Sequence, residues 1–162
     1  KRHHQYPMGT VSHATMRPED LIPTFLWELH GLAKTHGKHV DKATRRDHLR
    51  LCREIQGRIN NEYNYYSNSD ATDYDLESLF DALQEYAAPY FYFGAHPSGG
   101  SDYGFWLSDT FGDYDFDGLK VSDLSEVPKD YAGEILHIND HGNMSLYNKA
   151  RTQEPREIWA VV

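Results

Sequence analysis

The chain has 162 residues, of which 39% are hydrophobic and 14% aromatic, and its formal net charge is −9 at pH 7. This length suits one compact domain, and the aromatic content excludes a disordered polar chain. The single cysteine excludes an internal disulfide framework and a cysteine-rich zinc site, and no run approaches the ~18 consecutive apolar residues of a transmembrane helix. We therefore expect no membrane partner.

Residues 1–15, KRHHQYPMGTVSHAT, are rich in histidine and basic side chains and have no apolar periodicity. We expect them to be a disordered leader or a tag remnant that takes no part in the fold. From residue 16 onward the sequence shows neither an internal repeat nor a clear linker, so we expect residues 16–162 to form one domain.

Three helices are expected in the first half of the chain, because apolar side chains recur there at every third or fourth residue. The first begins at Pro18, a residue suited to the first helical turn, and ends near Gly37. Asp41 is placed to cap the second helix, and Thr72 to cap the third. The buried face of the third helix is expected to consist of Leu76, Leu79, Phe80, Leu83 and Ala87.

Aromatic and β-branched runs after Pro89 predict strands. The predicted strands are, in chain order, residues 90–96, 102–108, 134–140, 143–149 and 157–162. The first two form one hairpin and the next two a second hairpin, and residues 119–121 form either a short strand or a turn. Helices followed by strands indicate an α+β fold, with about three N-terminal helices packed on a C-terminal antiparallel sheet of about five strands.

Negative charge is concentrated in the middle of the chain. Residues 60–140 contain seventeen carboxylates but only Lys120 and Lys129 as basic residues, and they hold ten of the twelve tyrosines. Because the carboxylates are interleaved with aromatic and leucine side chains, we expect this part of the chain to fold rather than to be disordered. A folded acidic surface repels nucleic acid and attracts basic partners.

The candidate partner-binding residues are carboxylates of the third helix and of the loops that follow it. With its apolar face turned inward, the helix leaves acidic side chains on its opposite side, and Asp75 lies along the same helix. A rigid acidic surface can compete with DNA for a protein site that binds phosphates, and tyrosines add contact area to an interface. We predict one continuous acidic surface formed by Asp70, Asp73, Glu77, Asp81, Glu85, Asp109, Asp113, Asp115 and Asp117.

Asp113, Asp115, Asp117 and Gly118 spell D-x-D-x-D-G, the beginning of a calcium-binding loop. The twelfth position of such a loop is a bidentate glutamate, but here it is Leu124. We therefore expect a solvated acidic loop without a cofactor, and calcium is the weaker alternative.

His96, Asp140 and His141 are the weak candidates for catalysis, since a carboxylate can orient an imidazole for acid–base chemistry. Nothing in the sequence places a nucleophile beside them, so an enzyme is the alternative and not the main hypothesis. Cys52 falls on the apolar face of the second helix and is expected to be buried.

The second helix also carries a basic face, made of Lys42, Arg45, Arg46, Arg50, Arg53 and Arg58. Such a face can bind phosphates, but the rest of the chain is acidic and no glycine-rich phosphate loop accompanies it. We expect these side chains to pair with carboxylates of the protein itself or of a second copy. Residues 42–58 therefore offer a contact for a homo-oligomer, and no direct nucleic-acid partner is expected.

The FGAHP–DYGFW hairpin and the HINDHGN turn resemble segments of small proteins carried by bacteriophages and prophages, and the resemblance covers roughly residues 16–162. It implies a phage setting and no particular activity. Together with the charge distribution, it leads us to expect an inhibitor that occupies the basic nucleic-acid-binding surface of a host defence or DNA-handling protein in the bacterial cytoplasm. The alternatives are the small enzyme with a site near HINDHGN and a phage structural or self-assembling protein.

Overall fold

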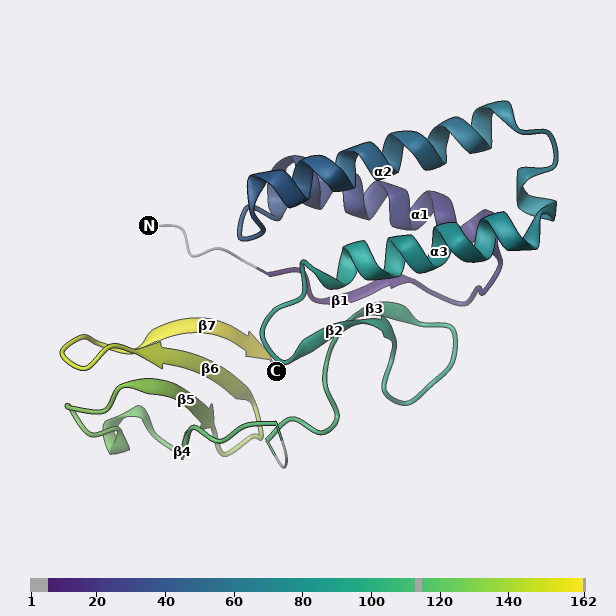
Figure 1. The fold of residues 1–162 in the computed structure, drawn as a ribbon. Coiled ribbons are helices and arrows are strands. Elements are labelled where there is room, and N and C mark those ends of the chain that lie inside the picture. Colours follow the sequence, from purple (N-terminus) through teal and green to yellow (C-terminus); the bar gives the residue numbers. More distant parts are fainter. Residues whose placement is uncertain (1–5, 113–114, 162) are drawn as a thin grey trace. The chain divides into compact units, whose positions relative to one another are not determined.

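The computed structural model describes residues 6–112 and 115–161, and it divides into two compact units, Lys1–Asp109 and Thr110–Val162. The first unit holds three α-helices and a three-stranded sheet, and the second holds a four-stranded sheet (Figure 1). The α+β fold class is confirmed. The single antiparallel sheet of about five strands is wrong, because the two predicted hairpins belong to different sheets and each sheet gains a further strand.

The first unit contains the helices that the apolar spacing predicts. They are α1 (Pro18–Gly31), which continues into the π-helical turn η1 (Leu32–His36), then α2 (Lys42–Asn61) and α3 (Ser69–Gln84), with the 3-10 turn η2 (Tyr65–Ser67) between the last two. The cap of α2 is as predicted, since the carboxylate of Asp41 accepts a hydrogen bond from the backbone N–H of Thr44 at 3.0 Å.

The start of α3 differs from the prediction. Asn68 is the N-cap, and its side-chain oxygen accepts a hydrogen bond from the backbone N–H of Ala71 at 3.2 Å. Thr72, the predicted cap, lies one turn inside the helix, where it is 1% exposed and donates its hydroxyl to the Asn68 and Ser69 carbonyls. Asparagine caps at least as well as threonine, so the helix gains a turn at its N-terminus.

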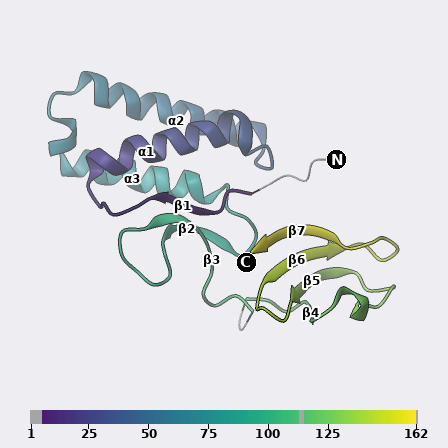
Figure 2. The same cartoon turned by 180° about the vertical axis from the view of Figure 1, so that it is seen from behind.

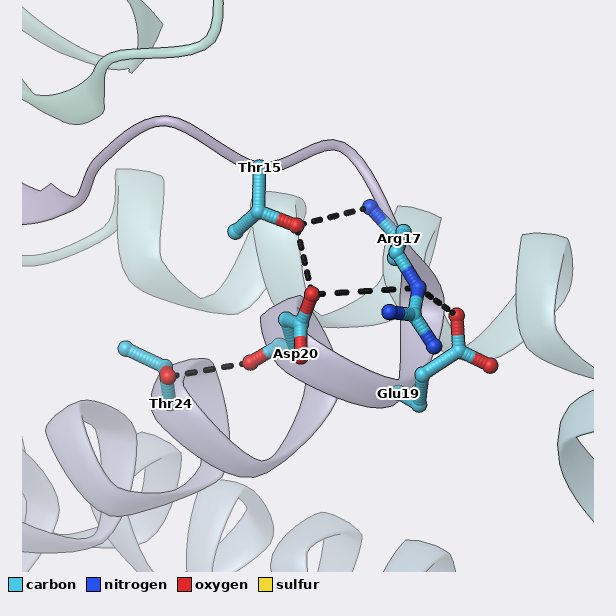
Figure 3. Close-up of polar contacts among 5 residues, drawn as sticks. All are labelled: Thr15, Arg17, Glu19, Asp20 and Thr24. Carbon is cyan, nitrogen blue, oxygen red and sulfur yellow. Dashed lines mark hydrogen bonds and ion pairs between the residues drawn. The ribbon is translucent and has the colours of Figure 1, made fainter.

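The first turn of α1 is held by side chains, although its N-cap residue, Arg17, makes no side-chain cap of its own (Figure 3). The Thr15 hydroxyl accepts a hydrogen bond from the Arg17 backbone N–H at 3.2 Å and donates one to the Asp20 carboxylate at 2.6 Å. Arg17 Nε lies 2.8 Å from a Glu19 oxygen. The carboxylates of Glu19 and Asp20 in this first turn also interact favourably with the positive end of the helix dipole.

The sheet of the first unit is antiparallel, in the order β1 (Gly9–Ser12), β3 (Tyr103–Leu107), β2 (Phe91–Ala95). Its helices lie together on one side of it (Figures 1 and 2). The core between them is aromatic, and the fully buried Phe25 ring of α1 contacts the rings of Phe80, Phe93 and Tyr103. Strand β1 lies within residues 1–15, so Gly9–Ser12 take part in the fold, contrary to the expectation for this segment.

The second unit has the strand order β4 (Leu119–Val121), β5 (Gly133–Ile138), β6 (Met144–Lys149), β7 (Arg156–Val161), with the 3-10 turn η3 (Leu124–Glu126) after β4. The predicted hairpin β5–β6 and the last strand are confirmed, whereas β4 pairs with β5 in parallel. Leu136, Leu146 and Trp159 lie opposite one another across three strands and are buried, and Phe111 packs on the Trp159 ring.

Candidate functional site

The exposed face of α3 carries a series of carboxylates, which we call the acidic row. The acidic row consists of Asp70, Asp73, Glu77, Asp81 and, at the C-cap of the helix, Glu85. The opposite face is buried through Thr72, Asp75, Leu79, Ala82 and Leu83. Of the predicted apolar face, Leu79 and Leu83 are buried, and the remaining members, Leu76, Phe80 and Ala87, pack partly buried against the same core.

Nothing in the described part of the first unit neutralises the acidic row. The sequence contains no lysine or arginine between Arg58 and Lys120, and none of the five carboxylates makes an ion pair or hydrogen bond with another described residue. Asp81 and Glu85 also lie at the C-terminal end of the helix, where its dipole disfavours negative charge. Local stability therefore does not require the acidic row.

One aromatic side chain in the middle of the acidic row was missed by the sequence reasoning. Tyr74 is 68% exposed on α3. Asp70 precedes it by four residues and Glu77 follows it by three, so that its ring lies between two carboxylates on the helix surface. That spacing is present in the sequence and was the signal that could have identified it. A tyrosine ring beside carboxylates favours contact with a guanidinium group.

Asp75, which lies on the same helix, is not part of the exposed face. It is 1% exposed and accepts hydrogen bonds from Arg58 Nε at 3.0 Å, from Arg58 Nη2 at 2.6 Å and from the Tyr65 hydroxyl at 2.6 Å. Burial and the hydrogen bond to Asp75 together raise the pKa of Tyr65. This cluster joins α2, η2 and α3, and it shows one arginine of the basic face paired with a carboxylate of the protein itself.

The other predicted partner-binding residues lie at or beyond the end of the first unit. Asp109 is its last residue and is exposed; Asp115 and Asp117 are exposed residues of the second unit, and Asp113 lies outside the described residues. The Asp115 carboxylate accepts a hydrogen bond from the Thr110 hydroxyl. Within the described ranges no three His, Cys, Asp or Glu side chains are grouped to hold a metal ion. The continuous acidic surface stays a prediction beyond α3.

The three weak catalytic candidates are found in two settings. His96 follows β2 in the first unit, where its Nδ1 accepts a hydrogen bond from the Ser98 backbone N–H at 3.1 Å and its ring packs edge-on against Trp106. Asp140 and His141 are exposed in the β5–β6 turn of the second unit. That turn is organised by the side chain of Asn139, which accepts the His141 backbone N–H at 2.9 Å.

A buried histidine lies where α2 meets the residues after α3. His48 is 9% exposed, and its Nδ1 lies 2.8 Å from the hydroxyl of the fully buried Tyr86. Burial lowers the pKa of His48, against a smaller opposing effect of Glu85, Asp47 and Asp41. Cys52, on the same helix, is buried as predicted, and burial raises the pKa of its thiol to about 11, so it is not a reactive thiolate at neutral pH.

We predict that the protein loses stability as the pH falls below about 6.5, the ordinary pKa of histidine. The folded state keeps His48 neutral, whereas the unfolded chain takes up the proton, so acid favours unfolding. Urea unfolding at neutral and mildly acidic pH measures the effect. The variant His48→Gln is expected to show a weaker pH dependence, whereas the exposed His141→Gln is expected to keep it; equal slopes in all three proteins would contradict the prediction.

The second unit has a hollow of about 670 Å³ beside the end of β6. Its walls are formed by some of the residues of segments 124–130 and 149–155, and none of the predicted site residues is among them. Lys149 is 7% exposed there, and its Nζ donates to the backbone carbonyls of Lys129 and Tyr131 at 2.7 and 2.9 Å. Its ammonium group therefore ties two chain segments together.

No helix in the described residues combines the length and apolarity that crossing a membrane requires. The acidic row of α3, with Tyr74 in its middle, is exposed, and its role in partner binding stays a prediction. Comparison of the chain with family models, with curated proteins and with solved structures gives no match.

Proposed function

We propose that this chain is an acidic, phage-type binding protein that inhibits a host defence or DNA-handling protein by occupying its basic nucleic-acid-binding surface. The observation that carries the proposal is the acidic row, which is exposed on α3 and has no ion-pair partner in the described part of the chain. The resemblance of the FGAHP–DYGFW and HINDHGN segments to phage proteins supports the setting, the cytoplasm of an infected bacterium.

The geometry of a helix suits this use. Successive residues rise 1.5 Å along the axis, so carboxylates at every third or fourth position repeat at about 5 Å along one face. Duplex DNA likewise presents a regular, rigid array of negative charge. A protein site that binds phosphates can bind the carboxylates of the helix with the same lysine and arginine side chains. Long-range electrostatic attraction also increases the association rate.

We expect the triple variant Asp73→Lys, Asp81→Lys, Glu85→Lys to lose partner binding by about 100-fold or more while its thermal midpoint stays unchanged or rises. Each lost surface pair contributes up to about 1 kcal/mol, and the reversed charges then repel the partner. The helix itself loses like-charge repulsion worth a few tenths of a kcal/mol per pair. Capture of partners from bacterial lysate at low salt, followed by titration calorimetry with the purified partner, measures both quantities.

The matched control reverses three exposed carboxylates of the second unit, Asp130, Glu154 and Glu157, and changes the net charge equally. It is expected to bind as the unmodified protein does. Duplex DNA and high salt should both release the captured partner. The proposal is wrong if the α3 variant still binds, or if DNA does not compete. A variant that unfolds would instead make the acidic row structural.

A further inference from the structure

We propose that the exposed basic side chains of α2 bind the acidic row of a second copy of this chain, giving a head-to-tail assembly. We call Lys42, Arg46, Arg50 and Arg53 the basic row; all four are exposed. This inference is independent of the partner proposed above, although both use the same face of α3.

The arginines of α2 differ in whether they have a partner within the chain. Arg58 is taken up by Asp75, and the half-buried Arg45 donates to the backbone carbonyls of Val40 and Ala33. Of the basic row, Arg50 has one exposed contact, with Asp47 at 3.3 Å, and the other three side chains have no ion pair with a described residue. Three cations without an ion pair to a described residue, and Arg50 with one exposed contact, thus remain for an external partner on a chain whose net charge is −9.

The two rows cannot satisfy each other within one chain. His48, Cys52 and Ile55 form the buried side of α2, and at 100° per residue the basic row lies on the opposite side of that helix. The acidic row likewise lies opposite the buried side of α3. Helix α1 packs against both helices (Figures 1 and 2), and no ion pair among the described residues joins one row to the other.

The rows are complementary in charge and comparable in length. Lys42 and Arg53 are eleven residues apart, so the basic row extends about 16 Å along α2, and the acidic row from Asp70 to Glu85 extends about 22 Å along α3. Each row carries charges of one sign, so the basic row laid along the acidic row brings opposite charges together, with Asp47 and Glu54 as the exposed carboxylates at the margin of the basic row. A second copy of the chain carries this complementary surface itself. For any other partner, an acidic surface of matching length would be an additional assumption.

Tyr74 adds a preference for arginine over lysine. Its ring is 68% exposed between Asp70 and Glu77, and three of the four cations in the basic row are arginines. A guanidinium stacks on a tyrosine ring and donates to neighbouring carboxylates at the same time, which an ammonium group does less well. The middle of the acidic row is therefore an arginine-binding surface, and the basic row of another copy presents the arginines.

The contact is heterologous, because the two surfaces differ. A dimer keeps one free row of each sign, one on each copy, so the assembly continues to grow with concentration unless a ring closes. Its affinity comes from exposed charges and falls as salt screens them over a Debye length of about 10 Å at 0.1 M. A copy bound at α3 also blocks the surface that the proposed basic partner would use.

Sedimentation velocity of the full chain tests the proposal. At low salt the average mass should rise with protein concentration, and the dissociation constant should be at least about tenfold higher at 0.5 M salt. Two neutral variants are compared: one carries Arg46→Gln, Arg50→Gln and Arg53→Gln, and the other Asp73→Asn, Glu77→Gln and Asp81→Asn. Each alone should be monomeric, and an equimolar mixture should give a 1:1 dimer and nothing larger, since one intact row of each sign remains.

The control removes three exposed cations of the second unit, with Lys129→Gln, Arg151→Gln and Arg156→Gln, and should assemble as the unmodified chain does. Far-UV circular dichroism verifies that all variants are folded. A monomer at low salt and high concentration, self-association of either neutral variant alone, or a mixture that stays monomeric would overturn the proposal. The proposal would also be overturned if the same arginines bound a duplex oligonucleotide and the chain did not self-associate. Because the α2 variant keeps the acidic row, its partner binding tests the proposed function separately.

Discussion

Replacing Asp75 with asparagine is expected to destabilise the first unit by about 3 kcal/mol, because it leaves the Arg58 guanidinium without its charged partner. Three hydrogen bonds, two from Arg58 and one from Tyr65, converge on this 1% exposed carboxylate. The Arg58 side chain is 31% exposed, so water relieves part of the loss and the larger penalties of fully buried pairs are not expected. Urea unfolding at neutral pH measures the change.

The control for this variant is Asp73→Asn, two residues earlier on the exposed side of the same helix. It removes the same charge and is expected to change the free energy of unfolding by less than about 0.5 kcal/mol. Equal effects of the two substitutions would show that the Asp75 cluster does not stabilise the junction of α2, η2 and α3.

Replacing Gly104 with alanine is expected to cost about 3 kcal/mol and to detach β1 from β3. A Cβ at this position would overlap the carbonyl oxygen of Gly9 and lie 2.9 Å from the Cα of Thr10. Both are backbone atoms of β1, which cannot turn aside as a flexible side chain could, so the strands must separate. Hydrogen exchange should show lost protection in β1 and β3, and urea unfolding should show the loss of stability.

Gly57→Ala on α2 is the matched control, since its added Cβ would meet no atom within 4 Å. Alanine is the better helix former by up to about 1 kcal/mol, so this variant is expected to be as stable as the original or more so. An unchanged exchange pattern in Gly104→Ala would mean that β1 pairs with β3 less closely than the structure indicates.

The helices and most strands could be predicted because their signals are local. The spacing of Leu79 and Leu83, the cap at Asp41 and the glycine-containing loop between β2 and β3 each depend on a few neighbouring residues. Which strands share a sheet depends on contacts between distant segments, and no local pattern of residues reveals those contacts. The parallel pairing of β4 with β5 and the position of β1 therefore could not be predicted.

The candidate site shows the same division. The acidic row follows from helical periodicity, and so does the buried position of Asp75, which is spaced with Thr72, Leu79 and Ala82. Its partner Arg58 lies on another helix, however, and no local pattern connects the two. The same periodicity places Tyr74 on the acidic side of the helix, whereas the extent to which its ring is exposed is known only from the packed structure.

The pairing of β1 with β3 has a consequence for how the first unit is made. Gly9 pairs with Phe105, so almost the whole unit must be synthesised before the strand has its partner. The helices and the β2–β3 hairpin join residues close in sequence and form faster, whereas closing so long a loop carries a larger entropic cost. The N-terminal strand leaves the ribosome early and is incorporated late, and until then the free edge of β3 is open to strands of other nascent chains.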